Sequence, residues 1–213
     1  MNAPTPEFRP LHGPEGPLWH AFVALYTASF PDWEREPPGQ IASRLTSGRY
    51  RLMLALEGDR LLGFYLLDRV PELDHALLCF LAVAPERRGQ GLGTALTRHC
   101  LAHYPEPSIH WLFIEAEEDP ARLYGRLGAR RLALEFRVPH FTDAGETPMH
   151  LMALRQPATP VQVGRDFLCP IIEHIFISGY GVDHDDPRLI RQCARVPERV
   201  RLEPWPARGN DHA

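Results

Sequence analysis

The spacing of apolar positions predicts helices and strands in a mixed order over the first half of the chain. Apolar residues of 17–29 recur at helical intervals, while 51–57 and 61–68 form two apolar strands separated by a Gly58-Asp59 turn. Residues 76–84 are almost continuously apolar, which predicts a central strand covered on both faces. In chain order we predict a strand at 7–11, helices at 17–29 and 40–46, and strands at 51–57, 61–68 and 76–84.

The pattern continues to about residue 155 and then changes. The further predicted elements are a helix at 92–103, a strand at 108–115, a helix at 120–127, and strands at 130–138 and 147–154. Residues 156–164 contain two prolines and are typical of a linker. An apolar stretch at 170–178 and a helix of about ten residues after Asp186-Pro187 predict a helical pair within 165–200. We therefore divide the chain into a domain at 1–157 and a linker with a C-terminal helical extension at 158–213.

Composition narrows the classes of function. The 213 residues are 44% hydrophobic and 23% charged with a formal net charge of −4, which argues against a nucleic-acid partner. No apolar run approaches the roughly 18 residues of a membrane span. The amino-terminal residues lack the features of a signal peptide, and the cysteines lack a disulfide-framework spacing. We expect a cytoplasmic protein with reduced thiols.

The most informative segment is a loop that joins the central strand to the next predicted helix. Gly89, Gly91 and Gly93 stand at alternate positions after Arg88. Glycine permits positive φ and a close approach of a ligand to the main chain. Free N–H groups of such a loop and of the helix that follows form a site for phosphate or pyrophosphate.

Three kinds of glycine-containing phosphate loop can be compared with this segment. A nucleoside-triphosphate loop needs a lysine, and the chain contains none. A dinucleotide fingerprint needs Gly-x-Gly-x-x-Gly, whereas the spacing here is Gly-x-Gly-x-Gly. Arg88, Gly91 and Gly93 do match Arg-x-x-Gly-x-Gly, which resembles the coenzyme-A loop of the GNAT acetyltransferase superfamily.

A second motif extends the resemblance to residues 7–155. Residues 120–129 read Pro-Ala-Arg-Leu-Tyr-Gly-Arg-Leu-Gly-Ala, which resembles the tyrosine-bearing helix of the same superfamily. Phe30, Pro31, Glu34 and Arg35 resemble a Phe-Pro-x-x-Glu-Arg motif in one bacterial subgroup of it. The resemblance implies an α/β (α+β) fold with a mixed, mostly antiparallel central sheet flanked by helices.

The resemblance also implies roles for individual residues. The pyrophosphate of acetyl-CoA would lie on 88–94, the pantetheine arm would pair with the edge of 81–83, and the Val83 N–H would polarise the thioester carbonyl. The implied cofactor-binding residues are Leu81, Ala82, Val83, Arg88, Gly89, Gln90, Gly91, Leu92, Gly93 and Thr94. Tyr124 matches the tyrosine that protonates the thiolate in many members, although such a tyrosine can also simply pack beside the cofactor.

The general base is less directly indicated. Many members carry a glutamate in the strand before the loop, but 76–84 has no titratable group except Cys79. The candidates are Glu115 and Glu117 after the next strand, and Glu72, Asp74 and His75 before the central one. We select Glu115, acting through water, although it could equally be a strand-end carboxylate in a polar network.

The acidic residues suggest a cationic acceptor. Asp32, Glu34 and Glu36 lie in the break between the first two helices, and Glu115 and Glu117 lie at a strand end that faces the same cleft in the superfamily. Converging carboxylates would favour a cationic amine. The alternative is that most of these charges are solvated loop residues.

Two functions of different classes follow from these features. The first is an acetyl-CoA-dependent N-acetyltransferase that acetylates a primary amine of a small molecule or peptide. The second is a non-catalytic acyl-CoA sensor or assembly module. We expect no metal, because Cys169, His174, His184 and Cys193 lack the spacing of a zinc site. The apolar tail should dock on the core or on a second subunit, as in a homodimer.

Overall fold

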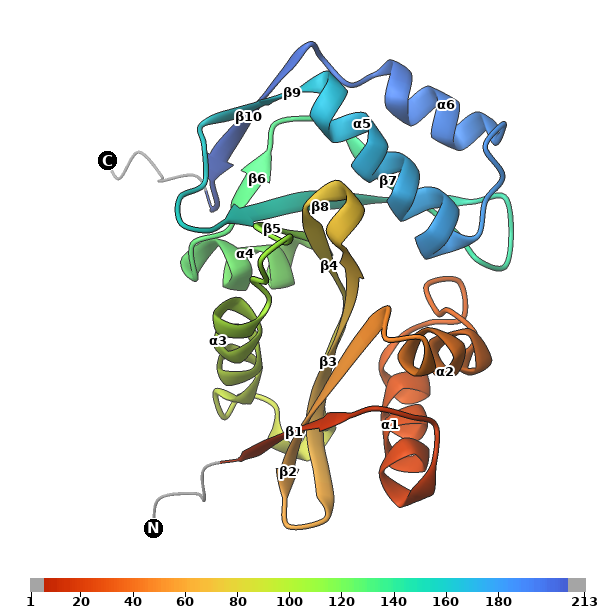
Figure 1. The fold of residues 1–213 in the computed structure, drawn as a ribbon, viewed down its shortest axis with the longest axis vertical. Coiled ribbons are helices and arrows are strands. Elements are labelled where there is room, and N and C mark those ends of the chain that lie inside the picture. Colours follow the sequence, from red (N-terminus) through yellow and green to blue (C-terminus); the bar gives the residue numbers. More distant parts are fainter. Residues whose placement is uncertain (1–5, 207–213) are drawn as a thin grey trace.

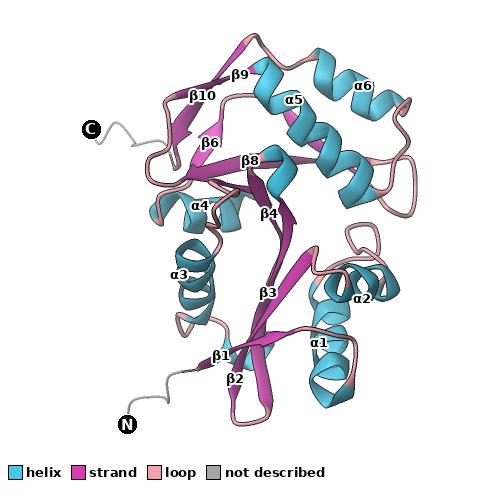
Figure 2. Ribbon diagram, in the orientation of Figure 1, coloured by secondary structure: helices cyan, strands magenta, loops and turns pink. Residues whose placement is uncertain are grey.

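The computed structural model describes residues 6–206, and its sheet forms the spine of the molecule (Figures 1 and 2). The strand order is β1-β2-β3-β4-β5-β8-β6-β10-β9, with β7 paired to β8. The β4–β5 pair is parallel and the other pairs of the described sheet are antiparallel. The predicted mixed, mostly antiparallel sheet flanked by helices is therefore observed.

Most predicted elements are present within a few residues of their expected ends. The helices are α1 Gly16–Ser29, α2 Pro38–Thr46, α3 Leu92–His103, α4 Glu118–Arg126, α5 Arg165–His174 and α6 Pro187–Ala194. The strands are β1 Glu7–Leu11, β2 Tyr50–Glu57, β3 Arg60–Val70, β4 His75–Val83, β5 Trp111–Ala116, β6 Arg130–Leu132, β7 Phe136–Pro139, β8 Glu146–Arg155, β9 Gln162–Gly164 and β10 Arg199–Pro204. Short 3-10 turns cover Pro71–Leu73 and Pro85–Arg87, and a π-helical turn, Ile175–Gly179, follows α5.

The helices cover the two faces of the sheet unequally. α3 and α4 pack on one face in a cluster that contains Leu96 and Tyr124. On the other face, α1 and α2 cover the strands before β5 through side chains such as Phe22 and Ile41. α5 and α6 cover the later strands of that face, so the tail continues the layer that α1 and α2 begin.

The strand predicted at 130–138 is wrong, because it is two strands. Arg131 lies opposite Met152 of β8, but Phe136 lies opposite Met149. From Arg131 to Phe136 the chain advances by five residues, while β8 advances by only three. The surplus residues therefore do not pair with β8. No glycine or proline at 133–135 announces the break.

The tail contains strands that the hydrophobic pattern did not predict. β9 lies within the predicted linker, and β10 pairs with both β9 and β6. Val200 and Leu202 of β10 are buried and alternate with polar residues, which is the period-2 pattern of a strand. The predicted division at residue 157 therefore falls within one continuous sheet.

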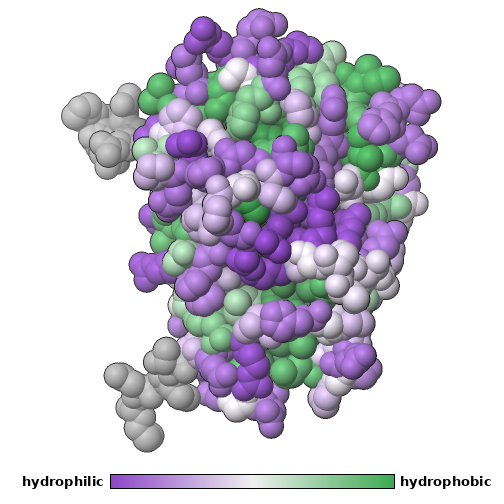
Figure 3. All heavy atoms as spheres, viewed as in Figure 1, coloured by the Kyte–Doolittle hydropathy of each residue, from purple (hydrophilic) through white to green (hydrophobic). Residues whose placement is uncertain are grey.

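The predicted helical pair of the tail lies against the core. Ile171, Ile172, Ile175 and Phe176 are at most 1% exposed, in a cluster shared with Phe113 of β5. The face drawn in Figure 3 is mainly polar, with apolar residues in separate patches. In the described part of the chain, the large hydrophobic side chains that remain exposed are Val161 and Ile190.

Candidate active site

A cleft forms where two neighbouring strands separate. β4 and β5 pair only as far as Leu78 opposite Ile114, although β4 continues to Val83. At the same level the β3–β4 register shifts and leaves Cys79 as an extra residue on β4. A bulge increases the local twist of a strand, which turns the rest of β4 away from β5. The cleft beside it has a volume of about 250 Å³.

One wall of the cleft is an unpaired main-chain edge. The Ala84 N–H donates to the Leu62 carbonyl of β3 at 2.8 Å. Because main-chain groups alternate in direction along an antiparallel strand, the amides of Leu81 and Val83 face the gap. Arg88 Nε donates to the Val83 carbonyl at 3.2 Å and ties the following loop to this edge.

The loop after β4 has the conformation that its glycines predict. Gly89 and Gly91 have φ of +70° and +83°, and a Cβ built at either position meets no atom within 4 Å. Gly91 is the N-cap of α3, with no side chain from residues 6–206 capping it and no acidic residue in the first turn. Free amides and open space at a helix N-terminus fit a pyrophosphate.

All ten predicted cofactor-binding residues therefore lie on one continuous edge and loop. They are Leu81, Ala82, Val83, Arg88, Gly89, Gln90, Gly91, Leu92, Gly93 and Thr94.

Tyr124 lies on α4 and lines the same cleft as Leu81 of the β4 edge. Its side chain is buried, and burial raises the pKa of the phenol well above its ordinary value. The phenol therefore keeps its proton at neutral pH and can donate it. Gly125 makes this position possible, because a Cβ there would overlap the Trp205 carbonyl after β10.

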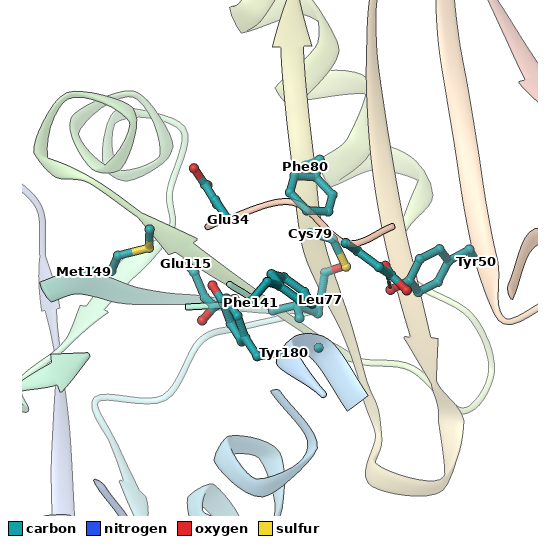
Figure 4. A pocket seen from close by; sticks show the side chains of 11 residues that line it. Glu34, Tyr50, Leu77, Cys79, Phe80, Glu115, Phe141, Met149 and Tyr180 are labelled. Carbon is teal, nitrogen blue, oxygen red and sulfur yellow. Dashed lines mark hydrogen bonds between the residues drawn. The ribbon is translucent and has the colours of Figure 1, made fainter. Parts of the chain in front are cut away.

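Glu115 lies near the end of β5 and borders the cleft. Figure 4 shows it among the residues that line a second, smaller cavity. Burial and then the neighbouring Glu34 raise the pKa of its carboxyl to about 8, against a hydrogen bond with Tyr180 that lowers it. Its Oε1 is buried and has no hydrogen-bond partner among the described residues. A carboxylate with this pKa can accept a proton near neutral pH.

Four of the five predicted acceptor-site carboxylates lie around the cleft. Glu34 and Glu117 line it with Glu115, and Glu36 lines a smaller cavity beside it. Burial, followed by Glu117, raises the pKa of Glu34 to about 7. The expectation for Asp32 is wrong, because its exposed side chain pairs with Arg35 and lines a separate hollow.

The three alternative bases that precede or begin β4, namely Glu72, Asp74 and His75, lie away from the cleft. The Asp74 carboxylate contacts His110 Nδ1 at 2.6 Å, and Glu72 contacts Arg49 Nη1 at 3.5 Å. His75 is fully buried at the start of β4, and burial lowers its pKa to about 4. None of the three borders either cavity among the described residues.

Sequence reasoning missed three residues of the site. Phe141, Met149 and Tyr180 border the smaller cavity and come from the β7–β8 connection, β8 and the tail. No motif joins them in the sequence, since packing alone brings them together. Within residues 6–206 no three His, Cys, Asp or Glu side chains are grouped to hold a metal ion. No described helix has the length and apolarity to cross a membrane.

An open amide edge, an anion-binding loop and a facing tyrosine and glutamate together suit transfer of an acyl group from a phosphate-bearing carrier. Comparison with known families agrees with this class of protein. The model of the acetyltransferase (GNAT) family matches residues 19–129, and the chain therefore belongs to that family.

Individual relatives are distant. The chain is 39% identical over 83 residues to a mycothiol acetyltransferase of Actinosynnema mirum, a match that covers 37% of this chain and 28% of that protein. A GNAT-family structure from Bacteroides thetaiotaomicron superposes with a TM-score of 0.66 at 17% identity, over 83% of this chain and 99% of that one. The structure of spermidine N-acetyltransferase from Vibrio cholerae, in complex with CoA and spermine, superposes with a TM-score of 0.56 at 17% identity. The match covers 72% of this chain and 97% of that one.

Proposed function

We propose that the protein is an acetyl-CoA-dependent N-acetyltransferase whose acceptor is a primary amine of a small molecule or peptide. The observation that carries the proposal is the shared cleft. Leu81 of the open β4 edge, Tyr124 and Glu115 all border it. Family membership supplies the acetyl donor.

The cofactor would be held mainly by main-chain groups. The loop amides of 88–91 and the first turn of α3 would receive the pyrophosphate, and the edge at Leu81 and Val83 would pair with the amides of the pantetheine arm. This pairing would bring the thioester carbonyl beside the Val83 N–H, a donor to the oxygen that becomes negative during attack.

Glu115 and Tyr124 would each transfer one proton during the reaction. The neutral amine nitrogen attacks the thioester carbonyl carbon, and its proton passes through water to Glu115. The C–S bond then breaks, and the leaving thiolate takes a proton from the Tyr124 hydroxyl. The products are an amide and free coenzyme A. The elevated pKa of Glu115 suits proton acceptance. The raised pKa of Tyr124 keeps the phenol protonated until the thiolate forms, although it also makes the phenol a weaker acid.

The decisive experiment measures thiol release from acetyl-CoA in the presence of a panel of primary amines, with mass spectrometry of the products. Amine-dependent thiol release and an N-acetylated product support the enzyme. Tight binding of acetyl-CoA without thiol release for any amine would favour the non-catalytic sensor. Hydrolysis that is independent of amine would contradict an amine acceptor.

A further inference from the structure

A small chamber adjoins the cleft at the end away from α3 and α4. Its volume is about 30 Å³, which is room for a group the size of a water molecule. Glu34 and Glu115 border both spaces, so a ligand in the cleft can extend a terminal group into the chamber. The polar and aromatic side chains around it include Glu34, Glu36, Glu115, Tyr50, Phe141 and Tyr180 (Figure 4).

Two carboxylate oxygens of the chamber lack hydrogen bonds. Glu36 is 1% exposed, and its Oε2 accepts from the Tyr50 hydroxyl at 2.7 Å. Its Oε1 lies 3.1 Å from Arg44 Nη1 in an ion pair without hydrogen-bond geometry. Glu115 Oε1 is also buried without a partner in the described part of the chain. Such oxygens are costly to bury, so the chamber is suited to a group that donates several hydrogen bonds.

The charge of the chamber selects the kind of donor. Three carboxyl groups border it and no basic side chain does, while Arg44 contacts Glu36 from outside the lining. Burial raises the pKa of Glu36 to about 7 despite Arg44 and Tyr50, so a cation beside it would stabilise the charged form of the carboxyl. The rings of Phe141 and Tyr180 add faces that attract cations. An ammonium group matches this environment in size, charge and donor number.

The tail of the chain closes the chamber. Gly179 and Tyr180 follow α5 and form its end wall, and the Ser178 carbonyl accepts from Arg44 Nη2 at 2.6 Å. Arg44 thus links the tail to Glu36. These wall residues lie outside the segment that matches the family model.

We propose that the chamber binds a protonated amino group of the acceptor, so that the acceptor is a compact diamine. One amino group is held between Glu36 and Glu115 under the Tyr180 ring, and the other is neutral and reacts in the cleft. The inference rests on the proposed function, because it assigns the second amino group to acetyl transfer. Tyr180 then limits the length of the acceptor from a segment outside the family match.

The test compares amines of equal length that differ only in the second amino group. Diaminopropane and diaminobutane are compared with propylamine and butylamine, by thiol release and by calorimetric binding to the CoA complex. We expect kcat/KM for each diamine to exceed that for its monoamine by about tenfold or more. Glu36→Gln should lower this ratio towards one. Asp32→Asn removes an equal charge from the same loop outside both cavities and should leave the ratio unchanged.

The outcomes separate this inference from the proposed function. Equal values for diamines and monoamines in the natural protein, or an unchanged ratio in Glu36→Gln, would overturn it and leave the chamber to water. Thiol release from neither class, with calorimetric binding that still prefers diamines and depends on Glu36, would refute acetyl transfer while supporting the chamber site. Absence of both binding and turnover would refute both.

Discussion

The proposed cofactor side of the cleft and its proposed acceptor side differ in the groups that form them. The proposed cofactor side consists of the β4 edge, the glycine loop and the first turn of α3, so its donors are main-chain amides. The acceptor side consists of side chains from the α1–α2 break, β5, β8 and the tail. A main-chain site depends on conformation, whereas a side-chain site depends on each residue and on the packing behind it. Substitutions on the two sides should therefore have different consequences.

Removal of the tail should have the largest effect, because it takes away both an acceptor-side wall and much of the core. Truncation after residue 157 removes several side chains at most 1% exposed, and five of these, Leu168, Ile171, Ile172, Ile175 and Phe176, come from α5 and the turn after it. At roughly 2 kcal/mol each, the loss of about 10 kcal/mol approaches the whole stability of a typical domain. We expect aggregation or loss of cooperative thermal unfolding in calorimetry. Ile190→Ser, an exposed change in α6, should leave the melting temperature almost unchanged. A soluble truncated protein with the original melting temperature would contradict this prediction.

Tyr124 tests a side chain that faces the cofactor side. Tyr124→Phe should lower kcat about a hundredfold with little change in the KM for acetyl-CoA, because the hydroxyl acts on the departing thiolate. Steady-state kinetics in a regime limited by chemistry measure the effect. Tyr104→Phe is the matched control, since its hydroxyl donates to the His110 carbonyl away from the cleft. An unaltered kcat would assign Tyr124 to packing.

Gly91 tests the main-chain side directly. Gly91→Glu imposes a φ of +83° on a side-chain-bearing residue and places a carboxylate at the anion loop. Calorimetry should find the affinity for CoA weakened by about thirtyfold. Gly39→Glu adds the same charge at a position with open space and ordinary φ, and should bind CoA normally. Equal affinities in a folded Gly91→Glu protein would move the pyrophosphate elsewhere.

Replacement of Glu115 should have the smallest effect on stability, and that effect should depend on pH. Its folded pKa of about 8 lies above its unfolded value near 4.3, so the folded state binds the extra proton between these values. The free energy of unfolding should therefore fall as the pH rises through this window, while kcat/KM rises until about pH 8. Glu115→Gln should lose the inflection of the kcat/KM profile near pH 8 and keep the rise that comes from deprotonation of the amine. Its free energy of unfolding should increase by about 1 kcal/mol at pH 8, or roughly 2–4 °C in melting temperature.

The control for this change is Glu135→Gln, whose exposed carboxylate pairs with Arg195 away from both cavities. It should alter neither profile. A Glu115→Gln protein with the original pH–rate profile would assign the proton transfer to another group.

The comparison also explains what the sequence could predict. The proposed cofactor side could be predicted because its residues are contiguous in the sequence. Gly89 and Gly91 indicate positive φ, and α3 begins directly after them. Glu34 and Asp32 look equivalent in the sequence, yet packing directs one to the cleft and leaves the other exposed. Tyr180 could not have been found, since it reaches Glu115 only after the tail has docked.

Errors in the fold have similar causes. The break between β6 and β7 depends on a mismatch of length with β8, which no local residue encodes. By contrast, the alternation in β10 was present in the sequence, so that strand could have been predicted.

The bond from Arg44 to the Ser178 carbonyl also has a consequence for the time course of folding. It joins residues 134 positions apart, and His174 Nε2 contacts Asp68 at 2.8 Å across 106 positions. Contacts of such separation form slowly, because a long loop must close before they gain any stabilisation. During refolding we therefore expect docking of the tail to be the slow step. The stability of the core and the completed acceptor end of the site should then return together, so that the last stretch of chain to be made decides when the protein becomes usable.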